Sequence, residues 1–65
     1  MTVDIKSTIE LSGERITPTF LAKTMGRPHQ TIHNWMKGGI IPRAANDRLI
    51  SIFKENGIEP LFLKN

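Results

Sequence analysis

Two histidines and two side-chain amides lie between positions 29 and 34, and their types limit the chemistry that they can do. His29 and His33 are four residues apart, so on a helix both imidazoles lie on one face. Such a pair can bind a metal ion, but a zinc protease also needs a glutamate directly after the first histidine. Gln30 stands there instead, and the chain has no cysteine to act as a further ligand. We therefore expect no metal ion and no cofactor at this segment.

The two amides, Gln30 and Asn34, point to a different chemistry. Each can form two hydrogen bonds with an adenine in the major groove of DNA, while a histidine can bond to guanine or to a phosphate. The alternative is that these residues are ordinary solvated polar side chains. In an arbitrary small helix this second interpretation is the commoner one. The acid-free residues 15–45 are compatible with the first, since they include five cations: Arg15, Lys23, Arg27, Lys37 and Arg43.

The length and composition of the whole chain limit the class of protein. The chain has 65 residues and a net charge of +3, which predicts one small domain, residues 1–65, with a mild attraction to polyanions. It has no cysteine, no apolar run long enough to cross a membrane and no signal-peptide pattern near position 1. We therefore expect a cytoplasmic protein.

The sequence does not favour an enzyme. No serine, histidine and aspartate can be placed together as a catalytic set, and the chain has no glycine-rich phosphate-binding loop. A chain of this length is also expected to lack room for a substrate cavity of roughly a few hundred Å³. We therefore expect no catalytic residue.

Residues 29–34 must be positioned by helices. Capping residues predict the first of these helices. Thr17-Pro18 is typical of a helix start, since the threonine hydroxyl can cap and proline suits the first helical position. Phe20, Leu21 and Met25 follow at helical spacing. A glycine at position 26 predicts the end of this helix, which would span residues 18–25.

The second helix would carry the histidines and amides, over residues 28–37. Pro28 is expected at its first position, and Gly38-Gly39 ends it. Ile32, Trp35 and Met36 form an apolar stripe at helical spacing. With that stripe turned inward, His29, Gln30, His33, Asn34 and Lys37 are expected to face outward.

A third helix is predicted from Arg43 or Ala44 to Glu55, where Asn56-Gly57 ends it. The apolar tail, residues 58–65, is either an extended strand or a packing arm. Residues 3–12 favour a helix by their spacing, although alternation of apolar residues leaves a strand open. The expected fold class is all-α, with four to five short helices, with or without a short C-terminal extended arm.

Residues 18–37 resemble the helix-turn-helix of the Cro and cI type, which occurs in phage repressors and many bacterial regulators. The resemblance rests on Leu21, Ala22, Met25, Gly26, Ile32 and Trp35. A small residue at 22 lets the second helix cross closely, Gly26 allows the turn, and the other four would form the shared core. The chain departs from the family pattern at Arg27, where an apolar residue is usual, and at Pro28, where a serine or threonine cap is usual.

The resemblance implies a DNA-binding role for particular residues. Residues at the start of the second helix and one turn further contact base edges in the family, and these correspond here to His29, Gln30, His33 and Asn34. The residues expected to contact phosphates are Thr19, Arg27, Thr31, Lys37 and Arg43. Phosphate contacts set affinity and register, whereas base contacts set sequence preference.

Three functional hypotheses follow. The first is a Cro-like repressor of phage or prophage origin, acting in the bacterial cytoplasm or nucleoid on a palindromic operator. The second is a DNA-bending recombination accessory protein of the excisionase or Cox type, because residues 35–42, WMKGGIIP, resemble the turn after its recognition helix. A strand pair usually follows in that group, whereas residues 43–55 favour a helix. The third is a protein-binding antirepressor or adaptor that uses the apolar tail.

A repressor of this size is expected to act as a homodimer, at least on DNA, because one recognition helix covers only a few base pairs. The tail supplies the candidate interface residues, which are Ile58, Leu61, Phe62 and Leu63. Two tails could pair as antiparallel edge strands. It is equally open that the tail packs on its own domain.

Overall fold

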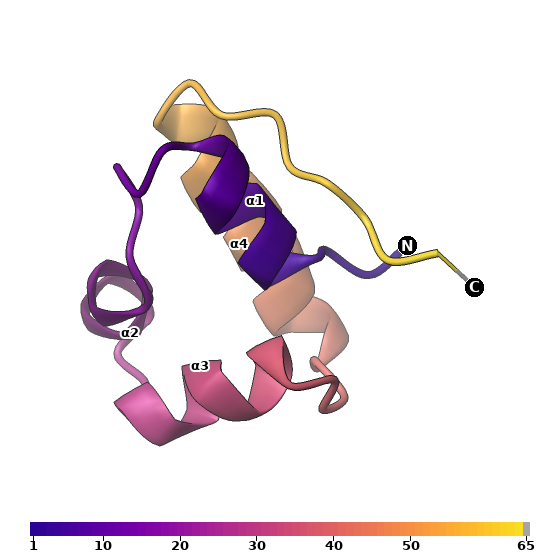
Figure 1. Ribbon diagram of the computed structural model, residues 1–65. Coiled ribbons are helices and arrows are strands. Elements are labelled where there is room, and N and C mark those ends of the chain that lie inside the picture. The colour runs from indigo at the N-terminus through magenta and orange to yellow at the C-terminus, as the bar shows by residue number, and fades with distance from the viewer. Residues whose placement is uncertain (65) are drawn as a thin grey trace.

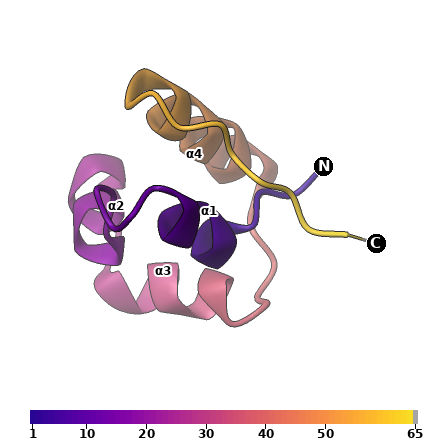
Figure 2. The same ribbon diagram turned by 45° about the horizontal axis from the view of Figure 1, so that its top comes forward.

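The structure is a computed structural model that describes residues 1–64, and it consists of four helices (Figure 1). They are α1 (Ile5–Leu11), α2 (Pro18–Met25), α3 (His29–Met36) and α4 (Arg43–Glu55). Within these residues there is no strand, only one isolated antiparallel bridge between Val3 and Phe62. The all-α prediction is confirmed, and residues 5–11 are a helix rather than a strand. Figures 1 and 2 show α1 in the middle of the fold, with α2, α3 and α4 around it.

The helix ends are set by side chains and backbone conformations close in sequence. Asp4 Oδ1 accepts a hydrogen bond from Ser7 N at 3.0 Å, which caps α1. Thr17 Oγ1 accepts one from Phe20 N at 3.1 Å, and Pro18 opens α2 as predicted. Since capping satisfies N–H groups that lack a partner within the helix, these bonds fix where α1 and α2 begin.

The predicted second helix is shorter than expected by one residue at each end. Pro28 has an extended ψ of 146° and is the N-cap of α3, not its first helical residue. Lys37 is the C-cap, and α3 runs from His29 to Met36. No side chain caps α3 at its N-terminal end, because the proline ring has no atom that can accept a hydrogen bond.

One hydrophobic core lies between the four helices, and residues from every helix enter it. Leu21, Ile32, Leu49 and Phe53 are completely buried. The other buried apolar residues are Val3, Ile5, Ile9, Ile16, Ala22, Trp35, Ala45, Ile52 and Ile58.

The core includes most of the predicted motif positions, with two corrections on α2. Met25 is half-buried and packs against the edge of the core. Phe20, which was expected on the apolar side of this helix, remains 37 % exposed. Adjacent residues on a helix point about 100° apart. Because Leu21 points into the core, Phe20 is turned away from it.

The C-terminal tail packs on its own domain. Ile58 is buried among the core residues, so it is not free to contact a second chain. Asp4 N donates to Leu61 O at 2.7 Å, and Leu63 N donates to Thr2 O at 2.8 Å. These bonds join residues 2–4 to residues 61–63, and we call this pairing the terminal clasp (Figure 2).

Two side chains hold the terminal clasp to the helices. The hydroxyl of the buried Thr8 donates to Asp4 O at 2.7 Å and accepts from Leu61 N at 3.0 Å. The amide of Asn46 on α4 accepts from Val3 N at 2.8 Å and donates to Met1 O at 2.9 Å. Each of the two therefore bonds to the backbone of a segment distant in sequence.

We predict that Thr8→Val lowers the free energy of unfolding by roughly 1–3 kcal/mol, because it keeps the shape of the side chain and leaves Leu61 N without its partner. Urea denaturation followed by circular dichroism measures the change. The matched control is Thr24→Val, since Thr24 is exposed and this substitution should change stability by less than about 0.5 kcal/mol. Equal stabilities for the two variants would contradict the role given to Thr8.

Candidate nucleic-acid interface

The candidate interface is built on α2, α3 and the short turn between them. Gly26 ends α2 in the left-handed conformation, with φ 66° and ψ 33°. A side chain at this position would meet no atom within 4 Å, so the glycine is required by the backbone conformation and not by lack of space. Arg27 N then donates to Ala22 O at 3.0 Å, which closes the turn.

Packing between α2 and α3 determines which side of α3 faces outward. Ile32 is completely buried and Trp35 is 8 % exposed, as predicted for core positions. On α2, Leu21 and the small Ala22 are also buried. Since Ile32 and Trp35 lie on one side of a short helix, the opposite side, with Gln30 and Asn34, is directed away from the core.

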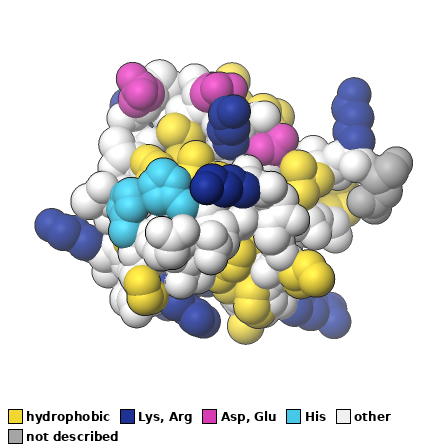
Figure 3. All heavy atoms as spheres, turned by 60° about the horizontal axis from the view of Figure 1, so that its bottom comes forward, with side chains coloured by type: hydrophobic (Ala, Val, Ile, Leu, Met, Phe, Trp, Pro, Cys, Tyr) yellow, Lys and Arg dark blue, Asp and Glu magenta, His cyan; other side chains and the backbone are white. Residues whose placement is uncertain are grey.

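The outward side of α3 carries the polar residues that the sequence singled out. His29, Gln30 and Asn34 are exposed, while His33 and Thr31 are half-buried. Figure 3 shows the two histidines next to each other on this face, with Lys or Arg side chains close by and at its periphery. The prediction of an outward orientation is confirmed for His29, Gln30 and Asn34, and in part for His33.

Contacts between these side chains give the face a defined arrangement. Gln30 Nε2 donates to Asn34 Oδ1 at 3.1 Å. The imidazole Nε2 of His29 lies 3.3 Å from Thr19 Oγ1, which links the start of α3 to the first turn of α2. The ring centroids of His29 and His33 are 4.5 Å apart. The base-reading candidates therefore lie side by side on one surface.

The predicted phosphate-binding residues surround this surface at different places. Thr19 lies beside His29, and Arg27 is exposed in the turn. Lys37 is exposed at the end of α3, and Arg43 is exposed at the start of α4. Thr31 is half-buried on α3 itself. The structure thus brings Thr19 into contact with a base-reading candidate and places Arg43 on a different helix.

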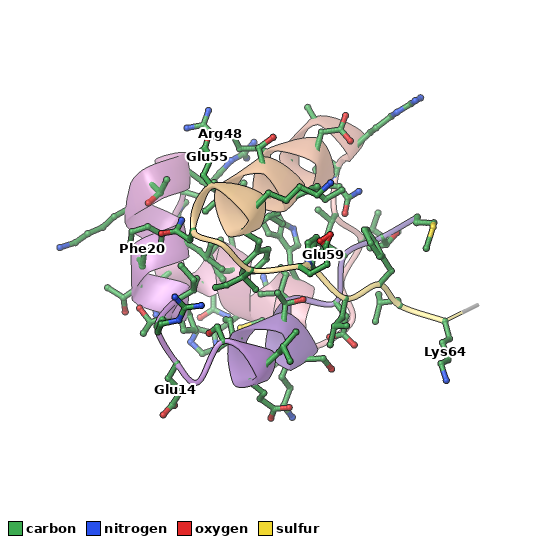
Figure 4. The ribbon with its side chains drawn as sticks, turned by 90° about the horizontal axis from the view of Figure 1, so that it is seen from above. Glu14, Phe20, Arg48, Glu55, Glu59 and Lys64 are labelled. Carbon is green, nitrogen blue, oxygen red and sulfur yellow. The ribbon has the colours of Figure 1, made fainter. Side chains whose placement is uncertain are left out.

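Charge is distributed unevenly around the fold. No acid occurs in residues 15–45, which include α2 and α3. Figure 4 views the molecule from the side opposite α3, and Glu14, Glu55 and Glu59 are seen there. In Figure 3, the acidic side chains lie toward the upper part of the view, away from the lower edge. The α2–α3 segment itself therefore presents no acidic side chain to a polyanion, and acids from other parts of the chain lie above the histidines in Figure 3.

A groove of about 540 Å³ lies at another part of the surface, contrary to the expectation that the chain lacks such room. The groove is partly open, and it forms where the N-terminal residues and Phe62 meet the start of α4. Its lining residues are Met1, Thr2, Ile41, Arg43, Asn46, Asp47, Ile50 and Phe62.

Two further properties concern only residues 1–64. The histidines and acids described there do not form a group of three or more that could hold a metal ion. No helix among these residues combines the length and the apolar character that a membrane span requires.

Several structural contacts were not predicted from the sequence. Gln30 and Asn34 have the four-residue spacing at which amide side chains bond on a helix, so that signal was present. The contact between Thr19 and His29 depends on the angle between two helices, and the Asn46 contacts cross 43 and 45 positions of chain. No local sequence signal predicts contacts of these two kinds.

Comparison of the chain with family models, curated proteins and solved structures found no match in any of the three.

We predict that Ile32→Ala lowers the free energy of unfolding by roughly 2–5 kcal/mol, because it leaves a cavity where α3 packs on the core. A domain of this size has only about 3–5 kcal/mol of stability, so the variant should be largely unfolded. The measurement is urea or thermal denaturation followed by circular dichroism.

The matched control for that variant is Ile40→Ala, which makes the same substitution at a residue that is 93 % exposed. Its stability should stay within about 0.5 kcal/mol of the wild type. If the two variants were equally stable, Ile32 would not be the residue that holds α3 in place.

Proposed function

We propose that the protein is a sequence-specific, double-stranded DNA-binding transcriptional regulator of the Cro-like type, encoded by a phage or prophage. In this proposal α3 enters the major groove of a palindromic operator and the protein acts as a repressor. The observation that carries the proposal is the outward side of α3, which is polar, free of acids and fixed in orientation by the buried Ile32 and Trp35. A major groove of B-DNA is wide enough to admit one α-helix.

The side chains on α3 divide into two roles under this proposal. His29, Gln30, His33 and Asn34 would contact base edges. Thr19, Arg27, Thr31, Lys37 and Arg43 would contact phosphates and set the register of α3 in the groove. Contacts between positive side chains and phosphates supply the part of the affinity that does not depend on sequence. This part falls as the salt concentration rises.

We further propose that the protein binds its operator as a homodimer, because one eight-residue helix reads too few base pairs for a specific site. The terminal clasp offers a surface for this. Leu61 and Leu63 are 42 % and 45 % exposed. Their backbones bond inward to residues 4 and 2, and backbone groups alternate in direction along an extended chain. The N–H and C=O of Phe62 therefore point to the outer edge, where a second tail can pair.

Two other functions are weighed against this one. An excisionase or Cox-type protein is less well supported, because helix α4 follows the turn at residues 37–42 instead of a strand pair. A protein-binding antirepressor or adaptor is favoured by the exposed Leu61 and Leu63 and by the groove near Phe62. It would bind DNA without sequence preference or not at all.

The experiment that tests the proposal is selection from a pool of random duplex DNA at about 150 mM salt, where non-specific attraction is weakened. We expect enrichment of a palindrome whose two half-sites are centred about 34 Å apart, one helical turn of DNA. Enrichment of direct repeats, with bending of the DNA, would favour the recombination accessory protein. Absence of any enriched sequence would contradict a regulator that reads DNA.

The role of charge is checked with a matched pair of lysine variants, whose affinity for the enriched operator and for random DNA is measured at several salt concentrations. Lys37→Ala should weaken specific and non-specific binding alike and lower the slope of log affinity against log salt by about one. Lys54→Ala removes the same charge from the last turn of α4 and should leave that slope unchanged. Equal slopes for both variants would mean that Lys37 does not contact a phosphate.

The dimer is tested by Leu63→Ala, which we expect to weaken self-association by at least roughly tenfold, since burial of a leucine side chain is worth about 1.5–3 kcal/mol and the dimer contains two copies of it. Sedimentation equilibrium measures the dimer dissociation constant, and the steepness of DNA binding with protein concentration gives a second readout. Leu11→Ala is the control, because Leu11 is an exposed leucine at the end of α1. A wild type that stays monomeric both free and on DNA would contradict the proposed dimer.

A further inference from the structure

The hydrogen bond between Gln30 and Asn34 leaves the two side-chain amides with different free donor and acceptor groups. Both residues are exposed and lie one turn apart on the outward side of α3. Gln30 Nε2 donates to Asn34 Oδ1 at 3.1 Å. This bond uses one of the two N–H groups of Gln30 and one of the two lone pairs on the carbonyl oxygen of Asn34.

The groups that remain free determine what the pair can recognise. Gln30 keeps one N–H and its carbonyl oxygen, which are one donor and one acceptor on the same planar amide. In the major groove, adenine offers one acceptor, N7, beside one donor, its N6 amino group. Guanine offers two acceptors, cytosine one donor, and thymine one acceptor beside a methyl group. Adenine is therefore the base whose edge matches the free groups of Gln30.

Asn34 Oδ1 is turned toward Gln30 and already uses one of its two lone pairs on this bond, so a two-point contact of Asn34 with a base competes with it. We therefore reassign Asn34 from a base-edge contact to the support of Gln30. By accepting this bond, Asn34 instead fixes the plane of the Gln30 amide. A glutamine side chain is flexible, and holding it in one arrangement before binding reduces the entropy that is lost when the complex forms. Asn34 is thus a positioning residue for Gln30.

We propose that Gln30 and Asn34 form a single adenine-reading unit, in which Gln30 makes both hydrogen bonds to one adenine and Asn34 orients the Gln30 amide. The inference rests on the proposed DNA-binding function and deepens it, since it assigns one A·T pair in each operator half-site to two residues. It also separates this pair from His29, whose contact with Thr19 ties it to the start of α2. Two independent base readers would instead specify two base pairs.

The test is the selection from random duplex DNA, carried out with the full chain as wild type, Gln30→Ala, Asn34→Ala and the double variant. We expect both single variants to lose the preference for adenine at the same position of each half-site. On the wild-type operator, Gln30→Ala should bind roughly tenfold more weakly. The double variant should bind within about twofold of Gln30→Ala, because residues that act as one unit are not additive.

A change in the DNA supplies the second readout, which a merely structural role of the pair would not alter. Replacement of that adenine by 7-deazaadenine removes the N7 acceptor. This change should weaken wild-type binding by roughly tenfold and leave Gln30→Ala and Asn34→Ala nearly unaffected. Lys54→Ala is the control protein and should respond to the modified operator as the wild type does. Circular dichroism of each variant confirms that it is folded.

The possible failures are distinguishable. If the wild type enriches an operator but the two single variants change different positions, or their losses multiply in the double variant, the joint reading is wrong and the DNA-binding function stands. If 7-deazaadenine has no effect on the wild type, the contact to adenine is wrong. If the wild type enriches no sequence, the proposed function fails and the adenine-reading unit fails with it.

Discussion

The burial of Ile32 and Trp35 is the interaction on which the outer surface of α3 depends. A helix of eight residues is not stable alone in water, since nucleation is costly and few hydrogen bonds follow it. Its position must therefore come from packing. Because these two residues are held in the core by α2 and the other helices, the rotation of α3 about its own axis is fixed. The orientation of Gln30 and Asn34 is a consequence of that packing and does not depend on contacts of their own with the core.

The sequence predicted those parts of the fold that depend on neighbouring residues. Thr17-Pro18 and Gly26 mark the bounds of α2 because a cap and a left-handed residue act within one turn of chain. The burial of Ile32 followed from spacing alone, since a helix repeats its faces every 3.6 residues. The polar face of α3 was predictable for the same reason, as the complement of its buried side.

The parts that could not be predicted depend on contacts between distant segments. The tail was equally compatible with a dimer arm and with packing on its own domain, and Ile58 is buried in the core that residues of all four helices form. Phe20 follows the apolar spacing of α2 and yet remains exposed. The groove beside Phe62 exists only where the two ends of the chain meet α4. A periodic pattern shows that a side chain is apolar, and the tertiary arrangement decides how much of it is covered.

The terminal clasp has a consequence for the order in which the domain folds. The bond from Leu61 to Thr8 joins residues 53 positions apart, and the bond from Val3 to Asn46 joins residues 43 apart. The contacts between α2 and α3, by contrast, connect residues on either side of a short turn. Long loops lose more conformational entropy on closure than short ones. We therefore expect the α2–α3 unit to assemble early and the clasp late, so that local opening begins at the two ends while the helix pair stays folded.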